Sequence, residues 1–252
     1  MKRRDLLLAS AGLLLFWQVI AKVVNQPILP PPDRVLITLW NETITGNLSG
    51  HFFASLSRVA ASTLLAIFTA APAGLALGQF KRLNAFFSPI IYILYPVPKV
   101  VFVPVVLLFL GIGDLSKIVV IYLILFFQIL VLVRDQAANL HPELIRSVRS
   151  LGAGRLALFR FVFLPASIPG ILTALRQSVG TAVAVLYIAE LFATQQGLGY
   201  YIYLNGNTLF NYPAMYAGVI AMSILGLGLY FTVDGLERLL CPWQVKNRST
   251  SG

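Results

Sequence analysis

The sequence predicts an all-α integral membrane protein with about six transmembrane helices, and three observations lead to this fold class. Of its 252 residues, 58% are hydrophobic and only 11% are charged, and the mean hydropathy is +0.82. An average soluble domain has about 25% charged residues. Apolar runs of the length that a spanning helix needs, about 20 residues, recur along the chain. Short polar or glycine-containing turns such as KRLN and GIGD separate these runs.

Composition also excludes several kinds of site. The single cysteine, Cys241, cannot form an intrachain disulfide, and the two histidines, His51 and His141, lack metal-ligand spacing. Neither histidine has an evident nucleophile beside it, so the sequence predicts neither a catalytic nor a metal site. The net charge of +10 would suggest nucleic-acid binding in a soluble protein. In a membrane protein it is expected from Lys and Arg in cytoplasmic loops, and we predict no nucleic-acid partner.

The first predicted span covers residues 6–24 and follows the basic sequence MKRR. A signal peptide, even a twin-arginine signal, is an alternative. An uncleaved anchor is favoured because the apolar run is long and no small-residue cleavage site closes it. Residues 25–55 are predicted to form an external loop with one interfacial helix, because the three prolines in PILPPPD prevent a helix from continuing.

Five further spans are predicted, and together with the first they form a single transmembrane domain over residues 1–252. Their ranges are 56–80, 85–110, 115–133, 168–191 and 213–233, with a polar loop at 134–167. Six crossings that start inside place both termini and the 134–167 loop in the cytoplasm. Of the 19 Lys and Arg residues, fourteen lie inside or near the inner ends of the spans, which supports this orientation. The five that do not are Lys22, Arg34, Arg58, Lys99 and Lys117.

Rows of small residues mark the helix faces that we expect to pack. Lipid gives helices no hydrophobic reason to associate, so small side chains that permit close backbone approach favour contact there. A chance pattern is the alternative, since Ala and Gly are common in membrane helices. The rows are Ala66, Ala70, Gly74 and Gly78 in the second span, and Gly170, Ala174, Ser178 and Ala182 in the fifth.

A different face of the fifth span carries polarity. At 100° per residue, Arg176, Tyr187 and Glu190 fall together on it. Ionisable groups within a span usually face a bundle interior or an aqueous path, which makes these three candidate pathway or gate residues. The alternative is that Arg176 and Glu190 lie at the membrane boundaries, where Glu190 caps a helix exit or pairs structurally.

The third span contains two prolines at its centre, in YPVPK. Pro96 and Pro98 remove backbone donors, so we expect a kink or break there, and a broken helix at membrane depth is tolerated where it lines a cavity. Tyr95 and Lys99 join them as candidate pathway residues, although a harmless kink is an alternative. Arg58 is the remaining candidate gate charge. Basic groups near a path would suit an oxyanion, unless they snorkel to headgroups.

The polar loop is patterned rather than featureless. HPELIRSVRSLGAGR predicts a helix entered at Pro142 with Glu143 in its first turn, then a reversal that Gly152 and Gly154 permit. A second amphipathic segment is predicted to end at Leu164 and Pro165. Such a helix could transmit force from a soluble partner, whereas the alternative is a solvated basic connector near anionic lipid.

This loop resembles the docking loop of ABC importer permeases. Gly152, followed by VFLP at residues 162–165, is similar to the G-x9-I-x-L-P half of the EAA motif. The resemblance extends from Ser55 to Leu239 and is to the nitrate, sulfonate, taurine and bicarbonate branch of binding-protein-dependent inner membrane components. Seven segments in the right order carry it: SLSRV, PVPK with Pro104, FLGIGDLSK, SLGAGR, LPASIPGILTALR, AELF and GLGYYI.

The resemblance implies a fold and a set of docking residues. It implies a type I (MetI-like) permease fold with a cytoplasmic coupling helix. The ATPase-docking residues that it implies are Arg146, Ser147, Val148, Arg149, Gly152, Ala153, Arg155, Leu164 and Pro165. One departure concerns the family's Glu-Ala-Ala, which is replaced by Arg146-Ser147-Val148 and so reverses one charge. An acidic residue on the partner, or Glu143, could compensate.

The resemblance further implies a multi-pass permease of a bacterial inner membrane. Its partners would be two ABC ATPase subunits, a solute-binding protein, a second copy of this chain and the lipid bilayer. The chain has no G-x4-G-K-[ST] motif, so ATP-Mg is expected on the ATPase and no cofactor on this chain, which is not itself predicted to be an enzyme. The solute class is nitrate, sulfonate or taurine, bicarbonate, or a pyrimidine precursor. The alternatives are an ion-coupled carrier that uses Glu190 as its proton site, an ABC permease for another solute class, and a membrane-embedded enzyme.

Overall fold

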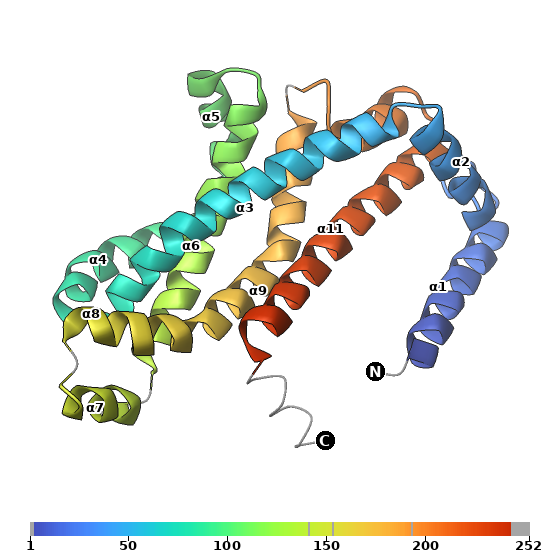
Figure 1. The fold of residues 1–252 in the computed structure, drawn as a ribbon. Coiled ribbons are helices and arrows are strands. Elements are labelled where there is room, and N and C mark those ends of the chain that lie inside the picture. The colour runs from blue at the N-terminus through green and yellow to red at the C-terminus, as the bar shows by residue number, and fades with distance from the viewer. Residues whose placement is uncertain (1–2, 141, 153, 193, 243–252) are drawn as a thin grey trace. The chain divides into compact units, whose positions relative to one another are not determined.

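The computed structural model describes residues 3–140, 142–152, 154–192 and 194–242, and the regular elements in these ranges are helices (Figure 1). The all-α prediction is therefore confirmed. In chain order the helices are α1 (Arg3–Val24), α2 (Pro32–Ile44), α3 (Leu48–Gln79), α4 (Lys81–Leu94), η1 (Lys99–Phe102), α5 (Val103–Leu110), α6 (Asp114–Ala138), α7 (Pro142–Ser150), α8 (Arg155–Leu158), η2 (Phe159–Phe163), α9 (Leu164–Leu191), α10 (Leu198–Tyr203), η3 (Leu204–Thr208) and α11 (Tyr212–Leu240).

Two compact units make up the described chain. The first contains residues up to 56 together with 190–225, and the second contains residues 57–189 together with those from 226 onward. The first unit holds α1, α2, α10 and η3. The second holds α4 to α8, with η1 and η2, and α9 up to Ala189.

Four helices in the described ranges are long and apolar enough to cross a membrane: α3, α6, the stretch Phe159–Leu191 and α11. The pair Lys81–Leu94 and Lys99–Leu110 is bent by 75° at the predicted break, and it makes a fifth span if the two helices count as one broken span and not as a re-entrant loop. The apolar part of α1, Leu8–Val24, is shorter than these helices. The structure thus gives four or five clear spans where the sequence predicts about six.

The predicted external loop at 25–55 is largely helical. Pro32 lies in the first turn of α2, where proline's missing N–H costs nothing, and α3 begins at Leu48, eight residues before the predicted span. The prediction missed this start because residues 25–55 are less apolar than the spans and carry the prolines of PILPPPD; the segment from Leu48 contains the polar residues His51 and Ser55. Both side chains are satisfied by bonds to a distant part of the chain, described below.

Small residues pack α3 against α6, as predicted. Ala66 and Ala70 are fully buried. A Cβ atom on Gly74 would lie 2.8 Å from the Leu130 carbonyl oxygen, and one on Gly78 would lie 2.7 Å from that of Arg134. In the second row, Ala174, Ser178 and Ala182 are buried, and Gly170 faces Gln136. The close approach of the backbones explains why larger residues do not occupy these positions.

The polar loop follows the predicted pattern at its start and differs at its end. A helix, α7, runs from Pro142, and Gly152 then adopts a left-handed φ of +81°. The second segment does not end at Leu164 and Pro165, however, because α8 continues through η2 into α9. The turn η2 is π-helical, with the Leu164 N–H donating to the Phe159 carbonyl. This wider turn accommodates Pro165, whose ring would clash with a carbonyl of a regular helix.

Candidate functional site

A buried polar network fixes the segment Gly197–Gly199 in the first unit. Three consecutive backbone N–H groups donate to side chains. The Gly197 N–H donates to His51 Nδ1 at 3.1 Å, and the Leu198 N–H donates to Ser55 Oγ at 2.8 Å. The Gly199 N–H donates to Glu190 Oε2 at 2.8 Å. Gly197 has a φ of +121°, which glycine adopts without strain.

Glu190 joins the two sides of this network. Its side chain is completely buried, and the Ser55 hydroxyl, 2.8 Å away, donates to its carboxylate. The carboxylate thereby satisfies the Gly199 N–H in the first turn of α10, which has no partner within that helix. The geometry corresponds to the capping alternative for Glu190, and any part in transport stays a prediction.

Arg58 is paired within the second unit. Its guanidinium lies 2.7 Å from Asp114 Oδ1, and only 4% of its side chain is exposed. Lys117, also buried, donates to the Gly113 carbonyl at 2.9 Å. The Arg58 contact ties α3 to the first residue of α6, and the Lys117 contact ties α6 to the glycine turn before it. Arg58 is therefore engaged by a carboxylate and is poorly placed to hold an oxyanion.

Lys99 closes the break in the bent span. Its ammonium group donates to the carbonyls of Leu94 and Tyr95 at 2.9 Å and to that of Val97 at 3.2 Å. Prolines at 96 and 98 interrupt the helix and free these carbonyls, and a lysine with three N–H donors satisfies them. The ammonium also lies 4.7 Å from the centre of the Phe127 ring, a cation–π contact.

Arg176 belongs to a charge cluster at the C-terminal end of α11. It contacts Asp234 Oδ1 at 3.1 Å and also Glu237, whose side chain is 6% exposed. Arg238 pairs with the second oxygen of Asp234 at 2.9 Å. This cluster joins α9 to α11 and, as with Arg58, uses the candidate pathway charge as a structural partner.

The other candidate pathway residues lie apart from these charge pairs. Tyr95 and Pro96 line an open groove of about 560 Å³ together with Val131 and Arg134 of α6. Pro98 is exposed, and Tyr187 is half-buried on α9. Within the second unit, the structure thus brings Tyr95 and Pro96 to a common surface.

The predicted docking residues centre on α7 and the turn after it. In the second unit α7 packs on α8 and η2, and it lies at the opposite end of α6 from the α5–α6 turn (Figure 1). Arg146, Ser147 and Arg149 are exposed, and Val148 is half-buried. Gly152 is exposed at the reversal, and Leu164 and Pro165 begin α9. Ala153 lies outside the described residues, and Arg155 begins α8.

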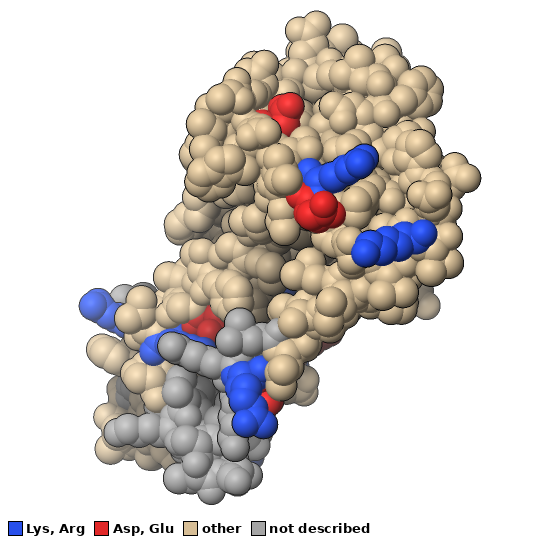
Figure 2. All heavy atoms as spheres, turned by 90° about the vertical axis from the view of Figure 1, so that its right-hand side faces the viewer, with Lys and Arg blue, Asp and Glu red and all other residues tan. Residues whose placement is uncertain are grey.

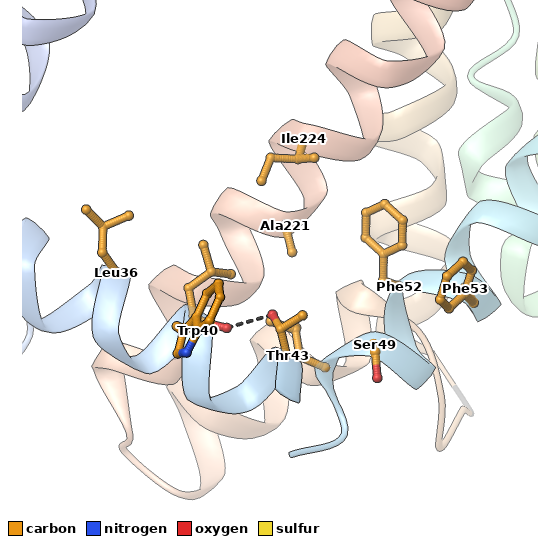
Figure 3. A pocket seen from close by; sticks show the side chains of 10 residues that line it. Leu36, Trp40, Thr43, Ser49, Phe52, Phe53, Ala221 and Ile224 are labelled. Carbon is orange, nitrogen blue, oxygen red and sulfur yellow. Dashed lines mark hydrogen bonds between the residues drawn. The ribbon is translucent and has the colours of Figure 1, made fainter. Parts of the chain in front are cut away.

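An apolar pocket of about 480 Å³ lies in the first unit (Figure 3). Figure 3 shows Leu36 and Trp40 on α2, Phe52 and Phe53 on α3, and Ala221 and Ile224 on α11 around it. The Thr43 hydroxyl donates to the Leu39 carbonyl at 2.6 Å, so it is satisfied locally. The lining carries no charged group and does not suit a polar solute.

Several residues of these networks were not singled out from the sequence: His51, Ser55, Asp114, Asp234 and Glu237. Three of the segments quoted above contained a usable signal. Ser55 and Arg58 lie in SLSRV, Glu190 lies in AELF, and Gly197 and Gly199 lie in GLGYYI. The structure joins these segments through hydrogen bonds that sequence separation conceals.

Comparisons with known proteins agree with the fold. A family model described as binding-protein-dependent transport system inner membrane component matches residues 62–246. The taurine transport system permease protein TauC of Escherichia coli (strain K12) is 33% identical over 92% of this chain and 87% of its own. The putative aliphatic sulfonates transport permease protein SsuC of Bacillus subtilis (strain 168) is 30% identical over 94% and 87%.

A solved structure of an inward facing conformation of the MetNI methionine ABC transporter has a similar fold. Its TM-score is 0.67 at 21% identity, over 79% of this chain and 98% of that one. At this identity the match shows the fold alone. It confirms the predicted MetI-like architecture.

Proposed function

The chain belongs to the family of binding-protein-dependent transport system inner membrane components, and on that premise we propose that it is the ATP-driven permease subunit of an importer for small organic anions of the sulfonate class. In this function a solute-binding protein delivers the solute on the outer face, and a separate ATPase drives translocation. The chain itself supplies a path and a mechanical connection.

The observation that carries the proposal is the position of α7. This short helix lies between two spans, exposes Arg146, Ser147 and Arg149, and is fixed on one side by α8 and η2. Because α8 continues through η2 into α9, a displacement of α7 would be passed to a spanning helix rather than absorbed in a loose loop. ATP binding to a docked partner would then bias two arrangements of the spans.

The assembly that this function needs contains two copies of the chain and two ATPase subunits. Both termini and α7 would lie in the cytoplasm of a bacterial cell, with the chain embedded in the inner membrane. The excess of Lys and Arg at the predicted inner ends supports that orientation. ATP-Mg would be bound by the ATPase and not by this chain.

Arg146 would be matched by an acidic residue on the ATPase. It is exposed on α7 with Arg149 three residues after it and Glu143 three residues before it, so this surface carries two cations and one carboxylate. We expect Arg146→Glu to lower the amount of ATPase that copurifies, because a paired carboxylate would become a like-charge contact. The control is Arg82→Glu, an exposed arginine in the first turn of α4. If Arg146→Glu retained the ATPase as well as the control did, the position would tolerate either sign.

The sulfonate class is supported by the relatives named for taurine and aliphatic sulfonates. Arg58, Lys99 and Arg176 are each engaged by a carboxylate or by carbonyls of this chain. Selectivity would therefore rest on the binding protein and on few contacts in the path. Deleting the gene in its native host should abolish uptake of labelled taurine or an alkanesulfonate. Unchanged uptake of both, with loss of nitrate or formylaminopyrimidine uptake, would assign a different solute.

A further inference from the structure

We propose that a cleft at the ends of α1 and α11 is the docking site for an acidic segment of the solute-binding protein, with Phe210 as its aromatic anchor. The inference rests on the proposed function, because it names the surface that a delivering protein would use. The cleft has a volume of about 600 Å³. We call it the outer cleft; the residues that the argument uses are Lys22, Asn25, Asp33, Arg34, Phe210 and Asn211.

Backbone strain is concentrated in this cleft. Among the described residues, two that are not glycine have a left-handed φ, Asn25 at +45° and Phe210 at +53°. Both line the outer cleft. Asparagine adopts this conformation fairly often, whereas for a bulky residue such as phenylalanine it is a genuine outlier. Strained residues persist where the surroundings enforce them, and they cluster at binding and active sites.

Hydrogen bonds on both sides enforce the strained conformation of Phe210. The Leu209 N–H donates to the Leu204 carbonyl at 2.9 Å, and the Asn211 N–H donates to the Asn205 carbonyl at 2.8 Å. The Asn211 carbonyl in turn accepts the Met215 N–H at 3.0 Å in the first turn of α11. Phe210 is therefore presented by a fixed turn, which lowers the entropy that a partner must overcome on binding.

The side chain that this turn presents is left uncovered. Phe210 is 66% exposed, although burying its ring would release apolar surface from water. It directly precedes Asn211 and the start of α11 at Tyr212, so it stands outside the spanning part of that helix. A rigid, exposed aromatic residue beside a polar cleft is typical of the anchor of a protein interface.

The charges of the outer cleft select the partner. Lys22 and Arg34 are both exposed, and among the described residues neither forms an ion pair within the chain. Asp33 contributes the cleft's single carboxylate. On the face drawn in Figure 2, most of the surface is tan, and scattered Lys or Arg and Asp or Glu side chains interrupt it in the upper half. Two cations against one carboxylate favour an acidic partner.

A protein segment fits these features better than a small anion does. The cleft is wide enough for several side chains, and Phe210 provides apolar surface that a small anion would not use. The outer cleft has a polar lining, whereas the pocket of Figure 3 has an apolar lining that suits lipid or another helix. Lys22 and Arg34 belong to the minority of basic residues placed on the outer side by the proposed orientation.

The test places a photocrosslinking amino acid at Phe210 in the native host, with Tyr203 as the matched control. Tyr203 is an aromatic residue of α10 that is 46% exposed and does not line the cleft. After irradiation of intact cells, the partner and the attached residue are identified by mass spectrometry. We expect a solute-binding protein attached near an acidic residue from position 210, and at least about tenfold less from position 203, as for an interface anchor.

A charge exchange then tests the chemistry. Changing Lys22→Glu and Arg34→Glu together should reduce the crosslink at least about tenfold, and changing the partner's crosslinked acidic residues to lysine should restore it. Crosslinks from position 210 only to lipid or to a second copy of this chain would overturn the proposal. So would equal crosslinking of the binding protein from positions 203 and 210. Recovery of the ATPase with the same tagged chain tests the proposed importer function separately. The docking proposal and the proposed function can therefore fail independently of each other.

A second variant removes the anchor without requiring crosslinks. Phe210→Gly relieves the left-handed strain, so its melting temperature should be equal to or above that of the unmodified chain. Stimulation of ATP hydrolysis by the binding protein in the reconstituted complex should nevertheless fall at least about tenfold. A lower melting temperature with full stimulation would show that Phe210 serves the fold and not the partner.

Discussion

Replacing Glu190 by glutamine separates a structural role of this residue from a role as a proton site. The carboxylate is fully buried and accepts from the Ser55 hydroxyl and the Gly199 N–H, each at 2.8 Å. Glutamine has nearly the same shape but only one accepting oxygen. An amide oxygen at the Oε2 position could keep both hydrogen bonds, but in Glu190→Gln both would then end on a neutral group instead of a carboxylate.

The expected cost follows from the loss of charge on the acceptor. A hydrogen bond to a charged group contributes about 1.5–3 kcal/mol and one to a neutral group about 0.5–1.5 kcal/mol, so each of the two bonds weakens by about 1–1.5 kcal/mol. Glu190→Gln should therefore destabilise the chain by about 1.5–3 kcal/mol. For a chain of this length, that corresponds to a fall of about 3–12 °C in the melting temperature.

The assay is thermal unfolding of the purified protein in one detergent at a fixed scan rate, because unfolding of membrane proteins is often irreversible. Ser55→Ala should cost a similar amount, and the double variant should cost less than the sum, since both belong to one network. Asp5→Asn, an exposed carboxylate on α1, is the control and should change little. An unchanged melting temperature with abolished transport would refute the structural role and favour a proton site.

Three other substitutions test the remaining contacts. Lys99→Met leaves the carbonyls of Leu94, Tyr95 and Val97 without the ammonium donor. We therefore expect the free energy of unfolding to fall by about 1–3 kcal/mol and proteolysis at residues 95–98 to become faster. Protease resistance equal to that of the unmodified chain would contradict this. Gly78→Ala should destabilise the chain by about 1–3 kcal/mol in thermal unfolding, because the new Cβ would meet the Arg134 carbonyl. The control Gly12→Ala should not, because its Cβ would have nothing within 4 Å. Similar melting temperatures for the two variants would count against close packing of α3 on α6. Gly152→Ala forces a left-handed φ on alanine and should lower the amount of ATPase that copurifies, because α7 would be misplaced. The control Gly154→Ala, whose Cβ would meet open space, should not. Full recovery of the ATPase with Gly152→Ala would show that this turn is not needed.

Local chemistry made the spans and α7 predictable from the sequence. Apolar runs located the long helices, and the break at Pro96 and Pro98 appears as the 75° bend of the third span. Pro142 and Gly152 marked the start of α7 and the reversal after it because each acts through its own backbone conformation. The small-residue rows indicated the packed faces for the same kind of reason.

The residues that escaped prediction depend on partners far away in the chain. The prolines of PILPPPD suggested a loop over residues 25–55, but α3 begins at Leu48, and His51 and Ser55 in its first turns accept hydrogen bonds from the segment Gly197–Gly199. Arg58 and Arg176 looked like free pathway charges because sequence does not show which carboxylate each one meets. The continuation through Pro165 depended on a π-helical turn, which no residue pattern announces.

Coupling through α7 is tested by purifying the tagged chain from its native membrane in mild detergent and identifying its stoichiometric partners by mass spectrometry. We expect an ABC-type ATPase to copurify and to be lost when residues 147–155 are deleted. A homo-oligomer without an ATPase in several detergents would contradict coupling through α7, and proton-linked transport through Glu190 would then be the alternative to test.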